Sequence, residues 1–379
     1  MRGIDVRKGL LLLFTLLLVF AIGPLWARGG AETNETVSEE HHEEEHDHDE
    51  DHEGDHDGDH DHDHDDDHEG EMAIPHIEAA DLAAGASLRV VASTSIVGDV
   101  VGRIAGSAAT VEVLMPRGQN PHAWEPTPRA IASVEDSYVA FVNGLDLEEA
   151  LLETMENVAG TYVVPVSAGI AVLEGGDHDD HDHDHDDAED HDHDHDHAGG
   201  DPHFWFDPTN VIIWAENIAE ALSEADPANH ELYEANRDAY IAELESLDLD
   251  VRNQVASIPR NRRKLVVDHV SLTYFAEEYG FEIIGEVIPA ISDQAEPSAQ
   301  HIAELAEVIR DEDVAAIIIG GTAGRGLRNL VDSVAEEVGR DVEIVEILTG
   351  SLAPAGSRGD TYLDFIRYNT EQIVAGLSE

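Results

Sequence analysis

The chain has 379 residues, enough for two domains of ordinary size. Its 83 acidic residues against 20 basic ones leave a net charge of −63, which excludes nucleic acids and anionic membrane surfaces as natural partners. The absence of cysteine excludes disulfides, thiolate metal sites and a lipid-bearing cysteine.

Residues 1–27 are typical of a secretory signal peptide. Arg2, Arg7 and Lys8 precede an apolar run at 10–22, and a small residue, Ala27, follows it. The run is short for a membrane span, although an uncleaved membrane anchor is an alternative. In either case we expect the rest of the chain outside the cytoplasm, in the periplasm or on the outer face of the cytoplasmic membrane.

Two tracts of low complexity, 41–71 and 177–197, hold ten and eight of the 24 histidines, and almost all their other residues are acidic. Such segments have little apolar surface to bury, so we predict disorder for both tracts and for the whole linker 28–87. Alternating His and Asp offer nitrogen and oxygen ligands, which favours a metal-gathering role over a plain acidic spacer.

From residue 88 onward, β-branched apolar runs alternate with helical patterns, which predicts parallel sheets covered by helices. In a first lobe, 88–225, the expected strands are 88–92, 111–115, 138–142 and 162–166. The expected helices there are 96–105, 128–134 and 147–157, with a further one beginning near Pro208.

A polar helical stretch at 229–257 separates this lobe from a second one, with start and stop signals at Pro227 and Pro259. We therefore assign 226–260 to a linking helix and 261–379 to a second α/β lobe. The expected strands of the second lobe are 265–267, 282–288, 315–319 and 343–347. Its expected helices are 272–279, 299–310, 327–338 and 362–376. The predicted fold class is α/β, with two lobes of mostly parallel sheet joined by a long helix.

Three of the six histidines outside the tracts are candidate metal ligands. His122 and His269 follow predicted strands, one in each lobe, and ligands of open α/β sheets bind beyond the carboxyl ends of strands. His203 lies on a first-lobe loop, before the helix near Pro208. We give no ligand role to the other three, which fit a linker or a helix surface: His76, His230 and His301.

Several ordered segments together resemble the zinc and manganese substrate-binding proteins of ABC transporters, the zinc-type periplasmic receptors in particular. The resemblance runs from about residue 88 to the C-terminus and covers all three candidate histidines. The segments that carry it are Asn120-Pro121-His122 with Glu125-Pro126-Thr127-Pro128, Asn143-Gly144-Leu145-Asp146-Leu147-Glu148, Asp201-Pro202-His203-Phe204-Trp205, His269 with Tyr274-Phe275 and Tyr279-Gly280, Glu296-Pro297-Ser298, and Asp360-Thr361-Tyr362 with Asn369.

The resemblance implies that His122, His203 and His269 bind a metal ion between the lobes, and that a membrane permease driven by an ATPase receives it. Many members carry a carboxylate in the loop after the last strand, but Gly350 stands at that position here, so the fourth ligand stays open between water and a carboxylate from elsewhere. Imidazole suits zinc better than manganese, although copper and nickel also bind it well.

We therefore expect a monomeric zinc receptor, without catalytic residues, whose affinity falls as pH drops through about 6.5 because metal binding needs neutral histidine. Two alternatives remain. A zinc buffer or surface adhesion protein would need only the tracts. A three-histidine zinc hydrolase would need a base, for which Glu125 and Asp268 are candidates.

Overall fold

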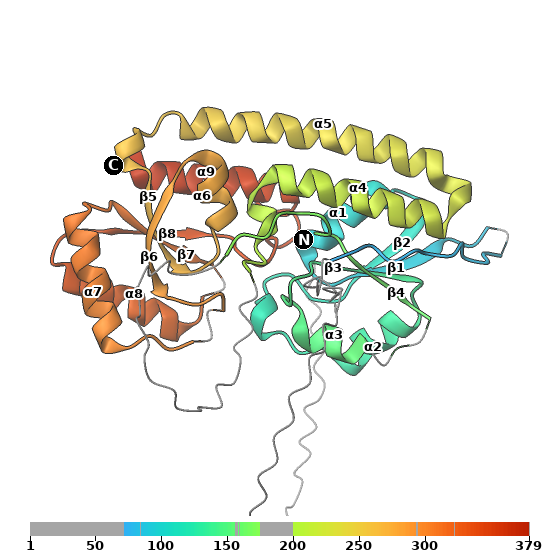
Figure 1. The fold of residues 1–379 in the computed structure, drawn as a ribbon, viewed down its shortest axis with the longest axis horizontal. Coiled ribbons are helices and arrows are strands. Elements are labelled where there is room, and N and C mark those ends of the chain that lie inside the picture. Colours follow the sequence, from blue (N-terminus) through green and yellow to red (C-terminus); the bar gives the residue numbers. More distant parts are fainter. Residues whose placement is uncertain are drawn as a thin grey trace, which may run out of the picture. The chain divides into compact units, whose positions relative to one another are not determined.

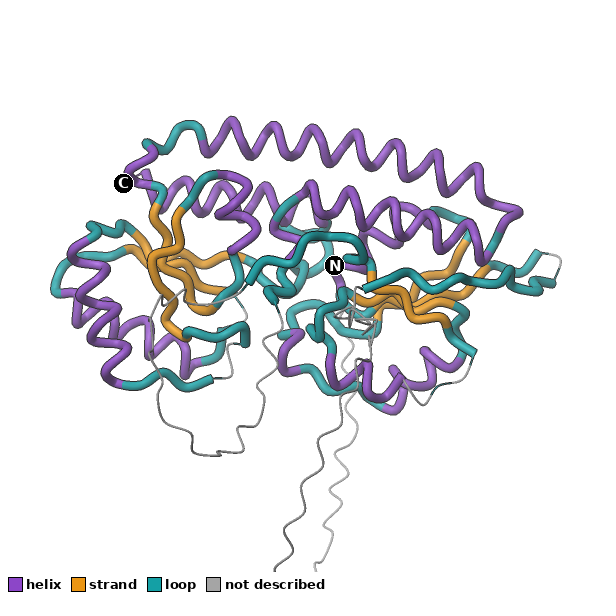
Figure 2. Tube along the Cα trace, in the orientation of Figure 1, coloured by secondary structure: helices purple, strands orange, loops and turns teal. Residues whose placement is uncertain are grey.

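The computed structural model describes residues 72–83, 85–155, 158, 160–174, 200–292, 295–321 and 323–378. The predicted signal peptide, the first tract and the second tract lie outside these residues. These described residues belong to one compact unit, which contains two separate four-stranded parallel sheets (Figures 1 and 2). The predicted fold class is confirmed.

The first sheet has the strand order β2-β1-β3-β4, and all its pairs are parallel. Alternate residues of β1 face opposite cores: Val90 packs with the helices α1 and α4, and Val91 with α2 and α3. The strands are β1 (Leu88–Ala92), β2 (Ala109–Val113), β3 (Val139–Val142) and β4 (Tyr162–Pro165). The helices are α1 (Ser95–Ala105), α2 (Pro128–Glu135), α3 (Glu149–Met155) and α4 (Pro208–Ala225).

The second sheet repeats this order as β6-β5-β7-β8, again fully parallel. Its strands are β5 (Lys264–His269), β6 (Glu282–Ile288), β7 (Ala316–Gly320) and β8 (Glu343–Ile347). The helices α7 (Ala299–Asp311) and α8 (Arg325–Val338) pack on one face, and α6 (Thr273–Tyr279) and α9 (Tyr362–Ser378) on the other.

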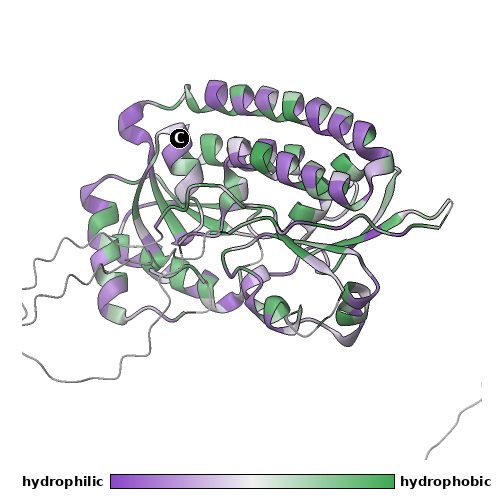
Figure 3. Ribbon diagram, turned by 45° about the vertical axis from the view of Figure 1, so that its right-hand side comes forward, coloured by the Kyte–Doolittle hydropathy of each residue, from purple (hydrophilic) through white to green (hydrophobic). Residues whose placement is uncertain are grey.

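The helix α5 (His230–Val255) connects the two halves and runs above both sheets in Figure 1. Hydrophilic and hydrophobic residues alternate along it in Figure 3, and it buries a stripe at helical spacing. The buried residues are Tyr233, Tyr240, Leu244, Leu247, Val251 and Val255. α9 packs beside α5, and the core continues from one lobe into the other through these helices and α4.

The strands differ from their predicted bounds in ways that matter for the site. β2 begins two residues earlier than expected, and β5 continues to His269, which is therefore the last residue of the strand rather than part of the following loop. The predicted linker also packs against the first lobe from residue 72 on. Ile77 is only 2% exposed, because its apolar side chain packs in the hydrophobic core. Its backbone N–H donates a hydrogen bond to the side chain of Glu224.

Candidate metal centre

His122 stands on a short 3-10 turn, Pro121–Ala123, in the loop that follows β2. The side chain of Asn120 caps this turn by accepting a hydrogen bond from the His122 backbone N–H at 3.1 Å. Pro121 suits the first position of the turn because its ring presets the backbone and it has no N–H to leave without a partner. His122 is half-buried, whereas the other two candidate histidines are buried.

His203 begins the segment that leads into α4, and Asp201 holds it in place. The Oδ1 atom of Asp201 lies 2.6 Å from His203 Nδ1 and accepts the His203 backbone N–H at 2.9 Å. Both side chains are almost fully buried, at 0% exposure for Asp201 and 2% for His203. The contact on Nδ1 leaves Nε2 as the nitrogen that is available to bind a metal ion.

His269 ends β5 in the second lobe, and Asp268 plays the corresponding part beside it. Asp268 Oδ1 lies 2.8 Å from His269 Nδ1 and accepts the His269 backbone N–H at 2.9 Å. The other oxygen, Oδ2, accepts the backbone N–H of Gly320, at the end of the neighbouring strand β7, at 2.6 Å. The aspartate therefore fixes the histidine to the sheet.

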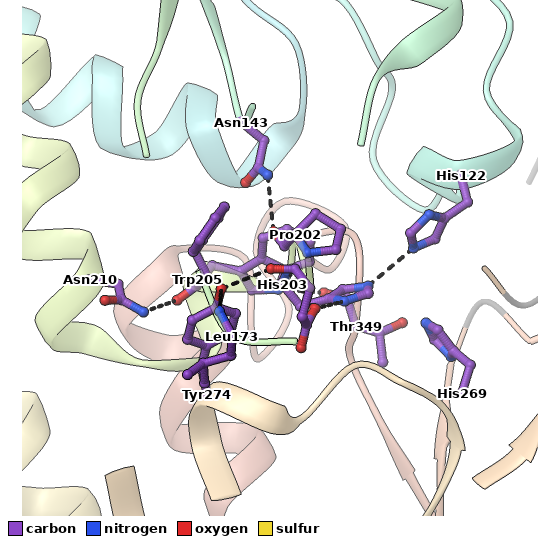
Figure 4. Close-up of polar contacts among 12 residues, drawn as sticks. His122, Asn143, Leu173, Pro202, His203, Trp205, Asn210, His269, Tyr274 and Thr349 are labelled. Atoms are coloured by element: carbon purple, nitrogen blue, oxygen red, sulfur yellow. Dashed lines mark hydrogen bonds and ion pairs between the residues drawn. The ribbon is translucent and has the colours of Figure 1, made fainter. Parts of the chain in front are cut away.

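The three histidines come together between the lobes, from three separate parts of the chain. Each offers a ring nitrogen, and these nitrogens all lie within 4.8 Å of one another. The ring centroids are 5.1, 5.4 and 5.8 Å apart. The Nε2 atoms of His122 and His203 are 3.1 Å apart, close to the separation of about 3.3 Å that two nitrogens on a tetrahedral zinc ion would have. Figure 4 shows His122, His203 and His269 converging on one space.

The space between the rings is a very small cavity of about 10 Å³, roughly the room that one water molecule or metal ion needs. This is below the range of about 300–1,000 Å³ that is common for small-molecule pockets. Its wall combines residues of both lobes: Asn120, Pro121, His122, His203, Asp268, His269, Gly320, Ala323, Thr349 and Gly350. Gly350 is part of this wall, at the position where many family members carry a carboxylate. Among the described residues, the ligand cluster consists of the three histidines.

The surroundings keep His122 neutral. Burial, together with the neighbouring His203 and His269, lowers the pKa of the His122 ring to about 2. Burial also acts to raise the pKa of Asp268, but His269 and the hydrogen bonds from His269 and Gly320 outweigh it, so this pKa lies below its ordinary value. The site thus presents a neutral imidazole next to an ionised carboxylate, which suits a metal cation.

Residues farther out brace the His203 segment from both lobes. Asn143 Nδ2 donates to the carbonyl of Pro202 at 3.0 Å, and Tyr274 Oη, from the second lobe, donates to the carbonyl of Asp201 at 2.9 Å. Trp205 packs edge-on against His203 and donates its indole N–H to the carbonyl of Thr349 at 3.0 Å. The contacts with Tyr274 and Thr349 join the His203 segment to the second lobe (Figure 4).

The other histidines of the described residues lie away from the cluster. His76 and His230 approach surface glutamates, and His301 contacts the backbone carbonyl of Glu286. Glu125, a candidate base for hydrolysis, is exposed. Asp201 and Asp268 were not predicted from the sequence as partners of the histidines. Their positions, two residues and one residue before a histidine, were the available signal.

The family model described as zinc-uptake complex component A, periplasmic, matches residues 90–376. The manganese-binding lipoprotein MntA of Halalkalibacterium halodurans is 32% identical over 295 residues, which cover 78% of this chain and 90% of that protein. The chain belongs to the zinc-uptake component A family.

Solved structures agree with this assignment. The periplasmic zinc binding protein TroA of Treponema pallidum superposes with a TM-score of 0.67 at 28% identity, over 77% of this chain and 99% of that one. The Mn-bound periplasmic metal binding protein of Candidatus Liberibacter asiaticus gives 0.66 at 25% identity, over 77% and 100%. The resemblance seen in the sequence is confirmed.

Family membership makes the protein the substrate-binding receptor of a metal ABC transporter, with its place outside the cytoplasm. Among the described helices, none is long and apolar enough to cross a membrane. The relatives differ in the metal that their names give, so the choice of metal has to be argued from the site itself.

Proposed function

We propose that the protein captures zinc with His122, His203 and His269 and delivers it to the permease of an ABC transporter. The observation that carries this proposal is the convergence of three imidazole nitrogens within 4.8 Å of one another, with no carboxylate in the cluster among the described residues. Zinc accepts nitrogen ligands at tetrahedral geometry, whereas manganese prefers oxygen-rich sites.

Several relatives are named for manganese and others for iron. Family members share a fold, and the metal is chosen by the ligands that each chain supplies. With three nitrogen donors, this chain should bind zinc more tightly than manganese. We propose a water molecule as the fourth ligand, since the cluster among the described residues contains no carboxylate and the cavity wall includes the polar residue Thr349.

We further propose that the protein is a monomeric receptor and not an enzyme. The cavity of about 10 Å³ leaves no room for a substrate beside a metal ion. Asp268, one candidate base for hydrolysis, already has both carboxylate oxygens engaged, by His269 and Gly320. The proposed division of the chain is a first lobe at 88–225, a linking helix at 226–260 and a second lobe at 261–379.

The test is zinc and manganese titration of the full chain and of a chain without residues 1–71 and 175–199. The shortened chain keeps residues 72–83, because Ile77 belongs to the core. We expect one tight zinc site in both chains, weak manganese binding, and loss of the tight site in H122A, H203A and H269A. His301→Ala is the matched control and should bind zinc as the parent does, because His301 lies outside the cluster.

Two results would contradict the proposal. If the shortened chain has no tight site, the tracts hold the metal and the protein is a buffer. If manganese binds as tightly as zinc, the ligand argument for zinc is wrong.

A further inference from the structure

The three histidines differ in what lies behind them. His203 and His269 each have a buried aspartate on Nδ1, one pair in each lobe, whereas His122 has the rings of the other two histidines as its neighbours. Asp201 and Asp268 are 0% and 2% exposed. Both carboxylates therefore lie in the low-dielectric interior, within one imidazole ring of the cavity.

The positive charge of a bound metal ion needs nearby negative groups. A divalent ion bound by three neutral imidazoles keeps its full charge of +2, and burying an uncompensated charge is strongly unfavourable. Among the residues that line the cavity, Asp268 is the one with an ionisable acidic side chain. Asp201 contacts His203 as Asp268 contacts His269: the Oδ1–Nδ1 distances are 2.6 and 2.8 Å.

Before metal binding, the carboxylate of Asp201 is only partly hydrogen-bonded. Asp201 Oδ2 is buried without a hydrogen-bond partner, although Oδ1 has two contacts with His203. A buried charged oxygen without a partner destabilises a fold, so its presence calls for a counter-charge. A metal cation on the far side of the His203 ring would supply that charge.

Resting on the proposed zinc site, we infer that Asp201 and Asp268 together take the place of an anionic ligand: they balance the charge of the bound ion through the rings of His203 and His269. Each is a positioning residue, since it touches a ligand and not the ion. The two lobes contribute one negative charge each, so the charge balance is complete only when both lobes surround the metal.

Asp201 gives the cleaner test of this inference. In D201N, the remaining Oδ1 still accepts both contacts from His203, and the new amide takes the place of an oxygen that has no partner. The substitution therefore removes the charge and keeps the orientation of the ring. In D268N, the new amide N–H would face the backbone N–H of Gly320, and two hydrogen-bond donors repel each other. The orientation of the side chain and its charge would therefore change together.

The experiment compares zinc affinity, measured by competition with a chelator, and metal-free thermal unfolding in the full chain. The variants are D201N, D201A, D268N and H203A. The matched control is D226N, which removes a buried carboxylate that contacts Asn229 and Tyr233 instead of a candidate ligand.

We expect D201N to bind zinc about tenfold more weakly or worse, the usual size of such effects, while its metal-free form unfolds at the same or a higher temperature. D268N should lose at least as much affinity, and D226N none. Weaker binding without loss of metal-free stability is a combination that a merely structural role would not produce.

The inference is overturned if D201N binds zinc as the parent does, whether or not D201A is weakened, because orientation would then suffice. It is also overturned if D201N loses metal-free stability together with affinity. H203A separates this failure from that of the proposed function: if H203A keeps the tight site, the zinc site itself is wrong.

Discussion

At the scale of single residues, His122 is the exception among the proposed ligands. It is the least buried of the three and stands on a loop, whereas His203 and His269 are held by aspartates next to α4 and at the end of β5. Its ring is nevertheless kept neutral, with a pKa lowered to about 2 by burial and by the two other histidines. Protons should therefore not compete with a metal for His122 near pH 6.5, unlike the expectation for an ordinary histidine.

This lowered pKa predicts a pH dependence of folding. In the unfolded chain His122 takes up a proton below its ordinary pKa of 6.5, whereas in the folded, metal-free protein it stays neutral to about pH 2. The unfolded state then binds more protons, so stability falls as pH drops below 6.5, by at most about 1.4 kcal/mol per pH unit for one group.

Denaturant unfolding of the metal-free protein and of H122Q, from pH 8 to pH 4.5, measures this effect. The difference in unfolding free energy between the two proteins should be constant above pH 7 and should shift in favour of H122Q below pH 6.5. A difference that stays constant over the whole range would show that the ring of His122 takes up its proton equally in both states.

At the scale of elements, the loop between β8 and α9 holds the lobes together as well as lining the site. Thr349 accepts the Trp205 indole N–H, and Ser351 accepts the backbone N–H of Gly118, both from the first lobe. The guanidinium of Arg117 donates to the carbonyls of Ala353 and Asp360, at 2.7 Å each. This loop therefore belongs to the second lobe by sequence and to both lobes by contact.

Loss of the Arg117 contacts should loosen the loop. R117M leaves the carbonyls of Ala353 and Asp360 without this donor, and we expect the free energy of unfolding to fall by about 1 kcal/mol, since the group is partly solvated. Zinc affinity should fall severalfold, because Thr349 and Gly350 line the metal cavity.

Denaturant unfolding and chelator competition measure the two effects, with R129M as the matched control. Arg129 is exposed, and its ion-pair partner within the described part of the chain is Glu112, at 3.9 Å, so its loss should change neither quantity. An R117M protein with the stability and affinity of the parent would show that the loop is held by its other contacts alone.

At the scale of the whole molecule, the lobes are joined by more than one helix. α5 and α9 lie side by side, and one hydrophobic core continues through them from lobe to lobe. The contacts of Trp205, Tyr274 and Arg117 add connections near the site. Metal capture should therefore involve local movement around the ligands and little rotation of one lobe against the other.

The chain offers a direct measurement of this rigidity, because it has no native cysteine. Spin labels on R129C and E307C, two exposed positions with one in each lobe, report the distance between the lobes. We expect the distance distribution of the double variant to keep its mean and width when zinc is added. A clear shift of the mean would show a hinge motion that the connections described above do not allow for.

The sequence alone was sufficient for the order of elements and for the choice of candidate ligands. Strands 88–92, 282–288 and 343–347 were predicted with their observed bounds, because alternating helices and buried β-branched runs are local patterns. His122, His203 and His269 could be selected because so few histidines remain outside the tracts. Strand ends such as that of β5 were less accurate, since they depend on the partner strands.

Only the tertiary structure decided how those residues act together. The sequence placed Asp201 and Asp268 near the histidines, but orientation determines whether an oxygen meets Nδ1, and that orientation depends on packing against Tyr274, Gly320 and their neighbours. The convergence of three rings from both lobes, and the continuous core beneath α5 and α9, likewise arise from contacts between residues far apart in the chain. No local pattern encodes such contacts, because their energies depend on the assembled fold.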